Sequence, residues 1–185
     1  MPALHSRLVR HPGRPADARC LAESSPNCRT LRLTFATGVS LYEGIVLPLR
    51  GEKITSAVIN LLGGPMQMIE YCMPADDASG RTVATYGEPG RERNGYFLGG
   101  TATLGLAVDG LPFIHCHGSF VTEAGDVRGG HIVTEKTIVG STPVTAFART
   151  IDSFIVQLSE DTETNHRVFH PRSTSGAITD GVHRS

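Results

Sequence analysis

The sequence has no tryptophan, and only 6% of its residues are aromatic. It also lacks net charge, because 17 lysines and arginines are balanced by 18 aspartates and glutamates. A near-neutral protein has no overall positive field to attract nucleic acid, so any contact with DNA must come from a local basic segment. No apolar run approaches the roughly 20 residues of a membrane-spanning helix. The composition therefore indicates neither a membrane protein nor a strongly basic DNA-binding domain.

Cysteine is scarce as well, and its four positions are scattered: Cys20, Cys28, Cys72 and Cys116. No two of them have the Cys-X-X-Cys spacing of a zinc or redox motif. The first residues, MPALHSRLVRHPG, contain no apolar segment long enough for a secretory signal. We therefore expect reduced thiols and a cytoplasmic protein.

The length of 185 residues suits one domain with tails. The 21 glycines and 11 prolines indicate a domain rich in turns. Residues 1–28 show no hydrophobic periodicity and form a predicted basic arm. Residues 29–170 form the predicted domain. Residues 171–185 are rich in serine, threonine and glycine, which predicts a flexible C-terminal tail.

Alternating and apolar runs predict that most of the domain is β-strand. One helix is indicated between Ser40 and Gly51, because Ser40 and Glu43 have the spacing of a capping box. Gly63-Gly64-Pro65 is expected to end one strand before the next begins. The predicted strands cover residues 30–36, 54–62, 66–72, 82–86, 96–108, 137–139, 144–149 and 165–169. Two further strands lie within residues 112–135, on either side of a break at 123–126, and the apolar segment 151–158 either extends the strand before it or begins another. Many strands with one helix predict an α+β domain, in which a largely antiparallel, curved sheet is packed by one or two helices.

The segment from Pro112 to Glu135 has the pattern of a β-hairpin. In an extended strand His115 and His117 point to the same side, and Cys116 points to the other. Gly125-Asp126 supplies the turn chemistry. A loop centred on Ala124 would place His117 opposite His131, with Cβ atoms of directly opposed residues about 5 Å apart.

Three imidazoles on one patch of a sheet predict a divalent metal site, and zinc is the ion that such ligands favour. Three protein ligands would leave one coordination position open, as in catalytic rather than structural zinc sites. The alternative is a His-X-His strand that lies at the surface without a metal. Cys116 is expected to be a packed thiol, because strand alternation turns it away from both histidines.

Three segments around this hairpin, LGGTATLG, GLPFIHCHGSF and GDVRGGHIV, resemble the PPC domain (plant and prokaryote conserved domain) in their order and spacing. The resemblance is strong over residues 98–149 and weaker over residues 29–86. It implies an α+β fold and a homotrimer formed by sheet-to-sheet contacts. It also implies DNA binding, by which this family is commonly described.

The arm contains Pro12-Gly13-Arg14-Pro15, which resembles the Arg-Gly-Arg-Pro hook of plant relatives in the DNA minor groove. Here Pro12 replaces the first arginine of the hook. The arginines left to contact DNA are Arg7, Arg10, Arg14 and Arg19, and we expect them to give only weak, non-specific binding through phosphates.

These patterns leave three functions open. The first is a homotrimeric, metal-binding PPC-like protein that acts as a DNA-binding or regulatory module. The alternative is a metal-dependent enzyme that acts on a small anionic or carbonyl substrate through an open site of His115, His117 and His131. No general base stands at a recognisable spacing to favour the enzyme. The third is a purely structural trimer with vestigial histidines.

Overall fold

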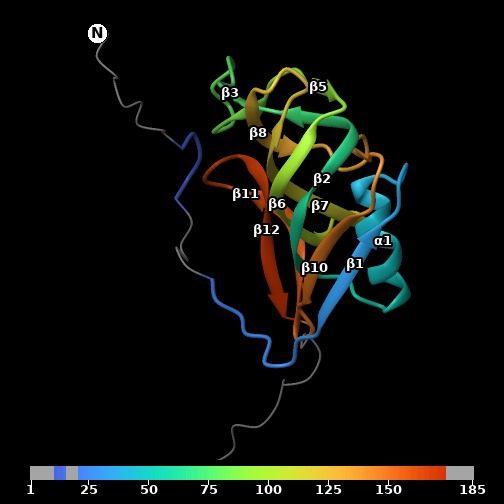
Figure 1. Cartoon of the computed structure of the whole chain (residues 1–185). Coiled ribbons are helices and arrows are strands. Elements are labelled where there is room, and N and C mark those ends of the chain that lie inside the picture. The colour runs from blue at the N-terminus through green and yellow to red at the C-terminus, as the bar shows by residue number, and fades with distance from the viewer. Residues whose placement is uncertain (1–10, 16–20, 174–185) are drawn as a thin grey trace, which may run out of the picture.

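The computed structural model describes residues 11–15 and 21–173 (Figure 1). It contains one helix, α1 (Leu41–Gly51), among the described residues. The strands are β1 (Thr30–Phe35), β2 (Ala57–Cys72), β3 (Pro74–Ala75), β4 (Thr85–Tyr86), β5 (Gly90–Arg93), β6 (Tyr96–Leu106), β7 (Pro112–Val121), β8 (Val127–Ile132), β9 (Ile138–Val139), β10 (Val144–Thr150), β11 (Phe154–Asp161) and β12 (His166–Ser173).

Ten of these strands form one sheet, whose order is β1-β10-β2-β8-β7-β6-β11-β12, with β5 and β9 paired to β2. β2 pairs with β6 along its first half and with β8 near its end, so β2, β6, β7 and β8 close into a ring. The pairings within this sheet are antiparallel except that of β6 with β11. The predicted α+β class with a curved, largely antiparallel sheet is confirmed.

β2 differs from the prediction of two strands that are separated at Gly63-Gly64-Pro65, because it runs through this segment without a break. Here β2 passes from β6 to β9 and β5. A Cβ atom on Gly63 would lie 2.8 Å from the carbonyl oxygen of Phe97. The glycines therefore allow the close approach at which the strand changes partners, which is one of the uses of glycine within strands.

The core lies between α1 and one face of the sheet. Leu41, Ile45 and Leu49 are fully buried and belong to one cluster with Ile59 of β2 and Cys116 of β7. The predicted capping box starts the helix: the backbone N–H of Glu43 donates to the Ser40 hydroxyl, and Glu43 accepts from the backbone N–H of Ser40, both at 3.1 Å. Both interactions satisfy amide groups that the first helical turn leaves unpaired.

The opposite face of the sheet leaves large apolar side chains in solvent. Val58, Leu62 and Phe147 are 45%, 44% and 40% exposed, whereas their strand neighbours are buried in the core. Phe147 pairs with Asn60, Asn60 with Thr101, and Thr101 with His117, so this face of the sheet continues through polar side chains across β10, β2, β6 and β7 to the histidines.

The C-terminal strand is longer than predicted: β12 continues to Ser173, and residues 174–185 of the predicted tail lie outside the described residues. β11 and β12 form a hairpin that lies beside β6 in Figure 1. Part of the predicted arm contacts the tip of this hairpin, where the Gly13 N–H donates to the Glu163 carbonyl at 2.9 Å. No helix within the described residues is both long enough and apolar enough to cross a membrane.

Candidate metal centre

The β7–β8 hairpin has the predicted register. His117 pairs with His131, Ser119 with Gly129 and Val121 with Val127. The turn is closed by hydrogen bonds between Thr122 and Gly125 and between Thr122 and Asp126, with Gly125 at a φ of +90°. Such a positive φ favours glycine, so the turn chemistry fixes the register that aligns the histidines.

His115, His117 and His131 converge on the face of the sheet opposite the core. Each offers a ring nitrogen, and these nitrogens all lie within 4.8 Å of one another. The ring centroids are 4.8 Å apart for His115 and His117, 5.1 Å for His115 and His131, and 5.6 Å for His117 and His131. No other group of at least three histidine, cysteine, aspartate or glutamate side chains in the described part of the chain is close enough to hold a metal.

These residues fit a zinc ion with a small adjustment. Two nitrogens that bind one tetrahedral zinc at 2.0–2.1 Å are about 3.3 Å apart, so the widest pair of ring nitrogens must come closer by up to about 1.5 Å. His115 and His117 are solvent-exposed. Rotation of their side chains supplies this movement without any change in the sheet.

Close contact between β8 and β2 positions His131. His131 pairs with Cys72 near the end of β2. A Cβ atom on Gly130 would lie 2.6 Å from the carbonyl oxygen of Cys72, so only glycine allows this approach. The Gly-Gly-His sequence therefore has a structural role: its glycines bring the third imidazole against the other two.

The surroundings of the cluster favour neutral imidazoles. Burial first, and then the charges of His115 and His117, lower the pKa of His131 to about 4. The pKa of His115 is also lowered, mainly because neighbouring atoms displace part of the water around its ring, and then by the charges of His117 and His166. A metal binds the neutral form of imidazole, so these shifts keep the ligands available to the ion.

Two residues beside the cluster were not predicted from the sequence. The hydroxyl of Tyr86 lies 3.4 Å from Nδ1 of His131, and the two ring centroids are 4.7 Å apart. His166, at the start of β12, lines the same cavities as His131 and Tyr86. No spacing or motif links these positions to the histidine strand, because they reach it only through tertiary structure.

Other residues near the hairpin have structural explanations. Cys116 is fully buried, and burial raises the pKa of its thiol to about 12, which agrees with the packed thiol expected from strand alternation. Arg128 lies 3.5 Å from the carboxylate of Asp126 and donates to the Tyr71 hydroxyl at 3.4 Å. Its guanidinium therefore contacts one residue of the hairpin turn and one residue of β2.

Of the four arginines predicted to contact DNA, the described residues include one. Arg14 is exposed, and Arg7, Arg10 and Arg19 lie outside the described residues. The neighbouring His11 contacts the carboxylate of Glu163 at 2.7 Å, which holds this part of the arm against the β11–β12 hairpin.

The fold is shared with solved structures of low sequence identity. A plant- and prokaryote-conserved (PPC) protein from Pyrococcus horikoshii has a TM-score of 0.61 at 21% identity, over 77% of this chain and 91% of the other. A "Putative DNA-binding protein" from Ralstonia eutropha has a TM-score of 0.62 at 21% identity, over 75% and 89%. The metal-containing protein AF0104 from Archaeoglobus fulgidus has a TM-score of 0.59 at 19% identity, over 83% and 99%.

No curated protein matches the chain. Residues 22–152, however, match the model of the Plants and Prokaryotes Conserved (PCC) domain. This range includes the curved sheet from β1 to β10 and all three clustered histidines. The chain therefore belongs to the PCC domain family, which the histidine strand and the Gly-Gly-His sequence had indicated.

Proposed function

We propose that this PCC-domain protein binds one divalent metal ion, zinc, through His115, His117 and His131. The observation that carries the proposal is the convergence of their ring nitrogens within 4.8 Å on an accessible face of the sheet. The fold neighbour from Archaeoglobus fulgidus, which is described as a metal-containing protein, supports it. Three imidazoles leave a tetrahedral ion one position for water or a ligand.

The surroundings favour a site that binds a ligand over one that turns over a substrate. When bound, the metal would polarise a ligand at its open position. A hydrolytic enzyme also needs a positioned group that accepts a proton, most often a histidine and otherwise a carboxylate. Among the described residues, those that line the two cavities next to the imidazoles include no aspartate or glutamate, which leaves His166 as the histidine outside the cluster that an enzyme would need. We assign the site to a regulatory module that binds a ligand, with the metal-dependent enzyme as the alternative.

The exposed apolar face supports the homotrimer that the family resemblance implies. Val58, Leu62 and Phe147 would be covered if copies of the chain packed sheet against sheet. Contact through this face would also bring a second copy close to the histidines, because Phe147 and His117 lie in one row of paired residues. The proposed location is the cytoplasm, which agrees with free thiols at Cys28, Cys72 and Cys116.

DNA binding is the second candidate, and the fold neighbour named "Putative DNA-binding protein" is the observation that favours it. The near-neutral charge of the chain restricts it to weak, non-specific contacts by Arg7, Arg10, Arg14 and Arg19. If all four arginines contact phosphates, the logarithm of affinity falls with the logarithm of salt concentration with a slope of about −3 to −4. Replacement of the four by serine should abolish binding to duplex DNA and leave the metal content unchanged. Absence of binding even at low salt would exclude this candidate.

Metal analysis of the protein as purified tests the main proposal. We expect about one zinc ion per chain by mass spectrometry, and loss of the ion in the His117→Ala/His131→Ala double variant, because one imidazole cannot hold it. The matched control is His5→Ala/His183→Ala, which removes two histidines from the predicted arm and tail. Equal metal content in the two double variants would contradict the proposed site.

A further inference from the structure

The β11–β12 hairpin lies beyond residue 152, where the match to the family model ends. Its base packs firmly on the domain. The rings of Phe169 and Phe113 make an edge-to-face contact with centroids 5.7 Å apart, and the Val156 N–H donates to the buried Ser56 hydroxyl at 2.9 Å. A Cβ atom on Gly105 would lie 2.6 Å from the Phe169 ring. The hairpin is thus fitted against β6 and β7.

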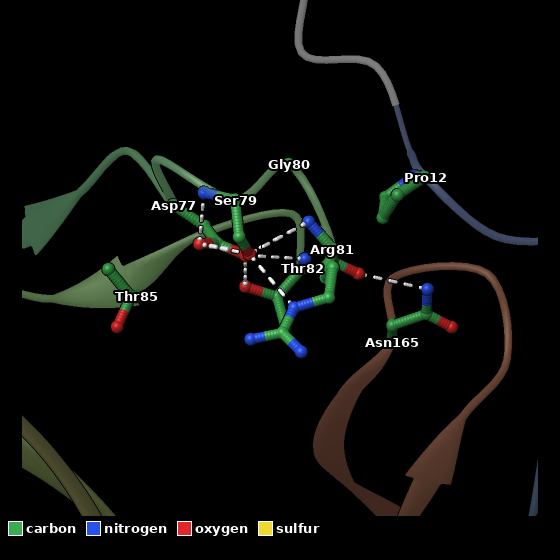
Figure 2. Close-up of a pocket in the computed structure, with 8 residues that line it drawn as sticks. All are labelled: Pro12, Asp77, Ser79, Gly80, Arg81, Thr82, Thr85 and Asn165. Carbon is green, nitrogen blue, oxygen red and sulfur yellow. Dashed lines mark hydrogen bonds between the residues drawn. The ribbon is translucent and has the colours of Figure 1, made fainter.

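The tip of the hairpin is held by two other segments. The Thr164 carbonyl accepts a hydrogen bond from the Val83 N–H at 3.0 Å, and the Asn165 side chain donates to the Arg81 carbonyl at 2.9 Å. Figure 2 shows the second of these bonds and, nearby, Pro12 of the arm. Because the arm also contacts Glu163, two separate segments hold the tip. The hairpin therefore forms a fixed wall beside the histidines.

A cavity of about 460 Å³ lies between this wall and the cluster. His115 and His131 line one side of it, together with Tyr86 and His166. A second cavity of about 350 Å³ shares Tyr86, His131 and His166 with the first, and it also reaches His117. Volumes of this size, roughly 300–1,000 Å³, are typical of sites for small molecules.

The chemistry of the cavity wall selects the kind of molecule. The part away from the histidines is mostly apolar and partly aromatic: Phe113, Leu158, Val168 and Phe169. The exception is Arg167, whose guanidinium donates to the Glu160 carboxylate at 2.6 Å. No residue that lines the cavity within the described chain is an aspartate or glutamate, so a negative charge would meet no carboxylate there. Three neutral imidazoles would leave a bound divalent ion with a net charge of +2, which attracts an anion. A ligand with an anionic group at the metal and an apolar group against the phenylalanines would therefore match both parts of the cavity.

We propose that the β11–β12 hairpin turns the open three-histidine site into a pocket for a small carboxylate with an aromatic body. The carboxylate would occupy the open metal position, and the ring would lie against Phe113, Val168 and Phe169. This inference rests on the proposed metal site, and it adds the class of ligand and the part of the chain that recognises it. The β11–β12 hairpin is then a recognition element that the matched family segment does not contain.

Calorimetric titration of the zinc-loaded full-length protein with phenylacetate and with acetate tests the pocket. Both acids offer the metal the same group, and only phenylacetate has a ring for the apolar wall. We expect phenylacetate to bind at least about tenfold more tightly, because burial of a ring removes a large apolar area from water. Protein treated with a chelator should bind neither acid. Equal affinities for the two acids, or no binding of phenylacetate to the loaded protein, would overturn the pocket.

A pair of matched variants locates the binding. Val168→Asp places a carboxylate in the cavity wall, and we expect it to weaken phenylacetate at least about tenfold while zinc content stays the same. Val108→Asp makes the same change at an exposed position in the turn between β6 and β7, 57% accessible, and should leave the affinity unchanged. Equal affinities in the two variants would overturn the assignment of this wall. If Val168→Asp does not fold, the comparison of the two acids decides the question in the wild type.

Failure of the wild type to take up zinc would overturn the proposed function, and with it this inference. Zinc uptake without preference for phenylacetate would overturn the inference alone.

Discussion

At the scale of residues, strand pairing brings three imidazoles together, although they repel each other when protonated. His117 and His131 are directly opposed, and His115 lies two residues along the same strand face. A second or third positive charge in this cluster is unfavourable, and burial disfavours even the first. The lowered pKa values of His115 and His131 follow from both causes. Without a metal, His115 and His131 therefore favour the neutral form, which is the form that binds a metal ion.

These shifts predict how the stability of the metal-free protein depends on pH. An unfolded histidine takes up a proton near pH 6.5, whereas the pKa of folded His131 is about 4. Between these values the unfolded state binds more protons than the folded state, so the free energy of unfolding falls as pH drops from about 6.5 to about 4. Above this window the shift has no effect on stability.

Urea unfolding with a chelator present, at pH 7 and at pH 4.5, measures the effect. The His131→Gln variant has no titrating group at this position and should lose less stability between the two pH values than the wild type. The same loss in both proteins would show that burial of His131 has no such effect.

The convergence of the three histidines could be predicted from the sequence because their placement is local. The alternation of His115 and His117 and the turn at Gly125 are sufficient to define the register. Tyr86 and His166 reach the same place from a short strand and from the C-terminal hairpin. The positions of Tyr86 and His166 beside the histidines depend on how segments distant in sequence pack together. The spacing of residues along the chain does not predict this packing.

At the scale of elements, the pairing of β6 with β7 depends on glycines that face a buried ring. Gly100 pairs with Gly118, and the fully buried Phe97 fills the space beside them. A Cβ atom on Gly118 would lie 2.7 Å from Cε2 of Phe97. Because the ring is enclosed by the core, it has no free space into which to move.

Gly118→Ala should therefore destabilise the protein by about 1–3 kcal/mol, the usual range for overpacking of a core. The matched control is Gly51→Ala at the end of α1, where an added Cβ atom meets nothing within 4 Å. There alanine should leave stability unchanged or raise it by up to about 1 kcal/mol, since it restricts the unfolded chain. Urea unfolding at one fixed protein concentration compares the two variants. A loss no greater for Gly118→Ala than for Gly51→Ala would contradict the close packing against Phe97.

Elements with strong local signals were predicted more accurately than those that depend on a change of partner. The capping box at Ser40 and Glu43 defined the start of α1 because both of its hydrogen bonds lie within four residues. The continuity of β2 through Gly63, Gly64 and Pro65 was missed. These residues usually interrupt a strand, and only the contacts of β2 with β6 and β9 explain why the strand continues.

At the scale of the whole molecule, the two faces of the sheet have different roles. One face is covered by α1 and contains the core. The other carries the histidines on β7 and β8 and exposed apolar side chains on β2 and β10. An apolar surface of this kind on a folded protein is typical of an interaction site. The proposed trimer would cover it and would leave the metal site close to the contact between copies.

Light scattering of the wild type should give a mass near three times 19.8 kDa. Phe147→Arg should shift the protein toward monomers, because Phe147 lies between Arg32 and Asn60 in the sheet and a further guanidinium would have to be buried against another copy. Leu47→Arg is the matched control, since Leu47 is an exposed leucine (64%) on α1 outside the proposed interface. A wild type that remains monomeric at all concentrations would exclude the trimer. A trimer that tolerates Phe147→Arg as well as Leu47→Arg would place the contact on another surface.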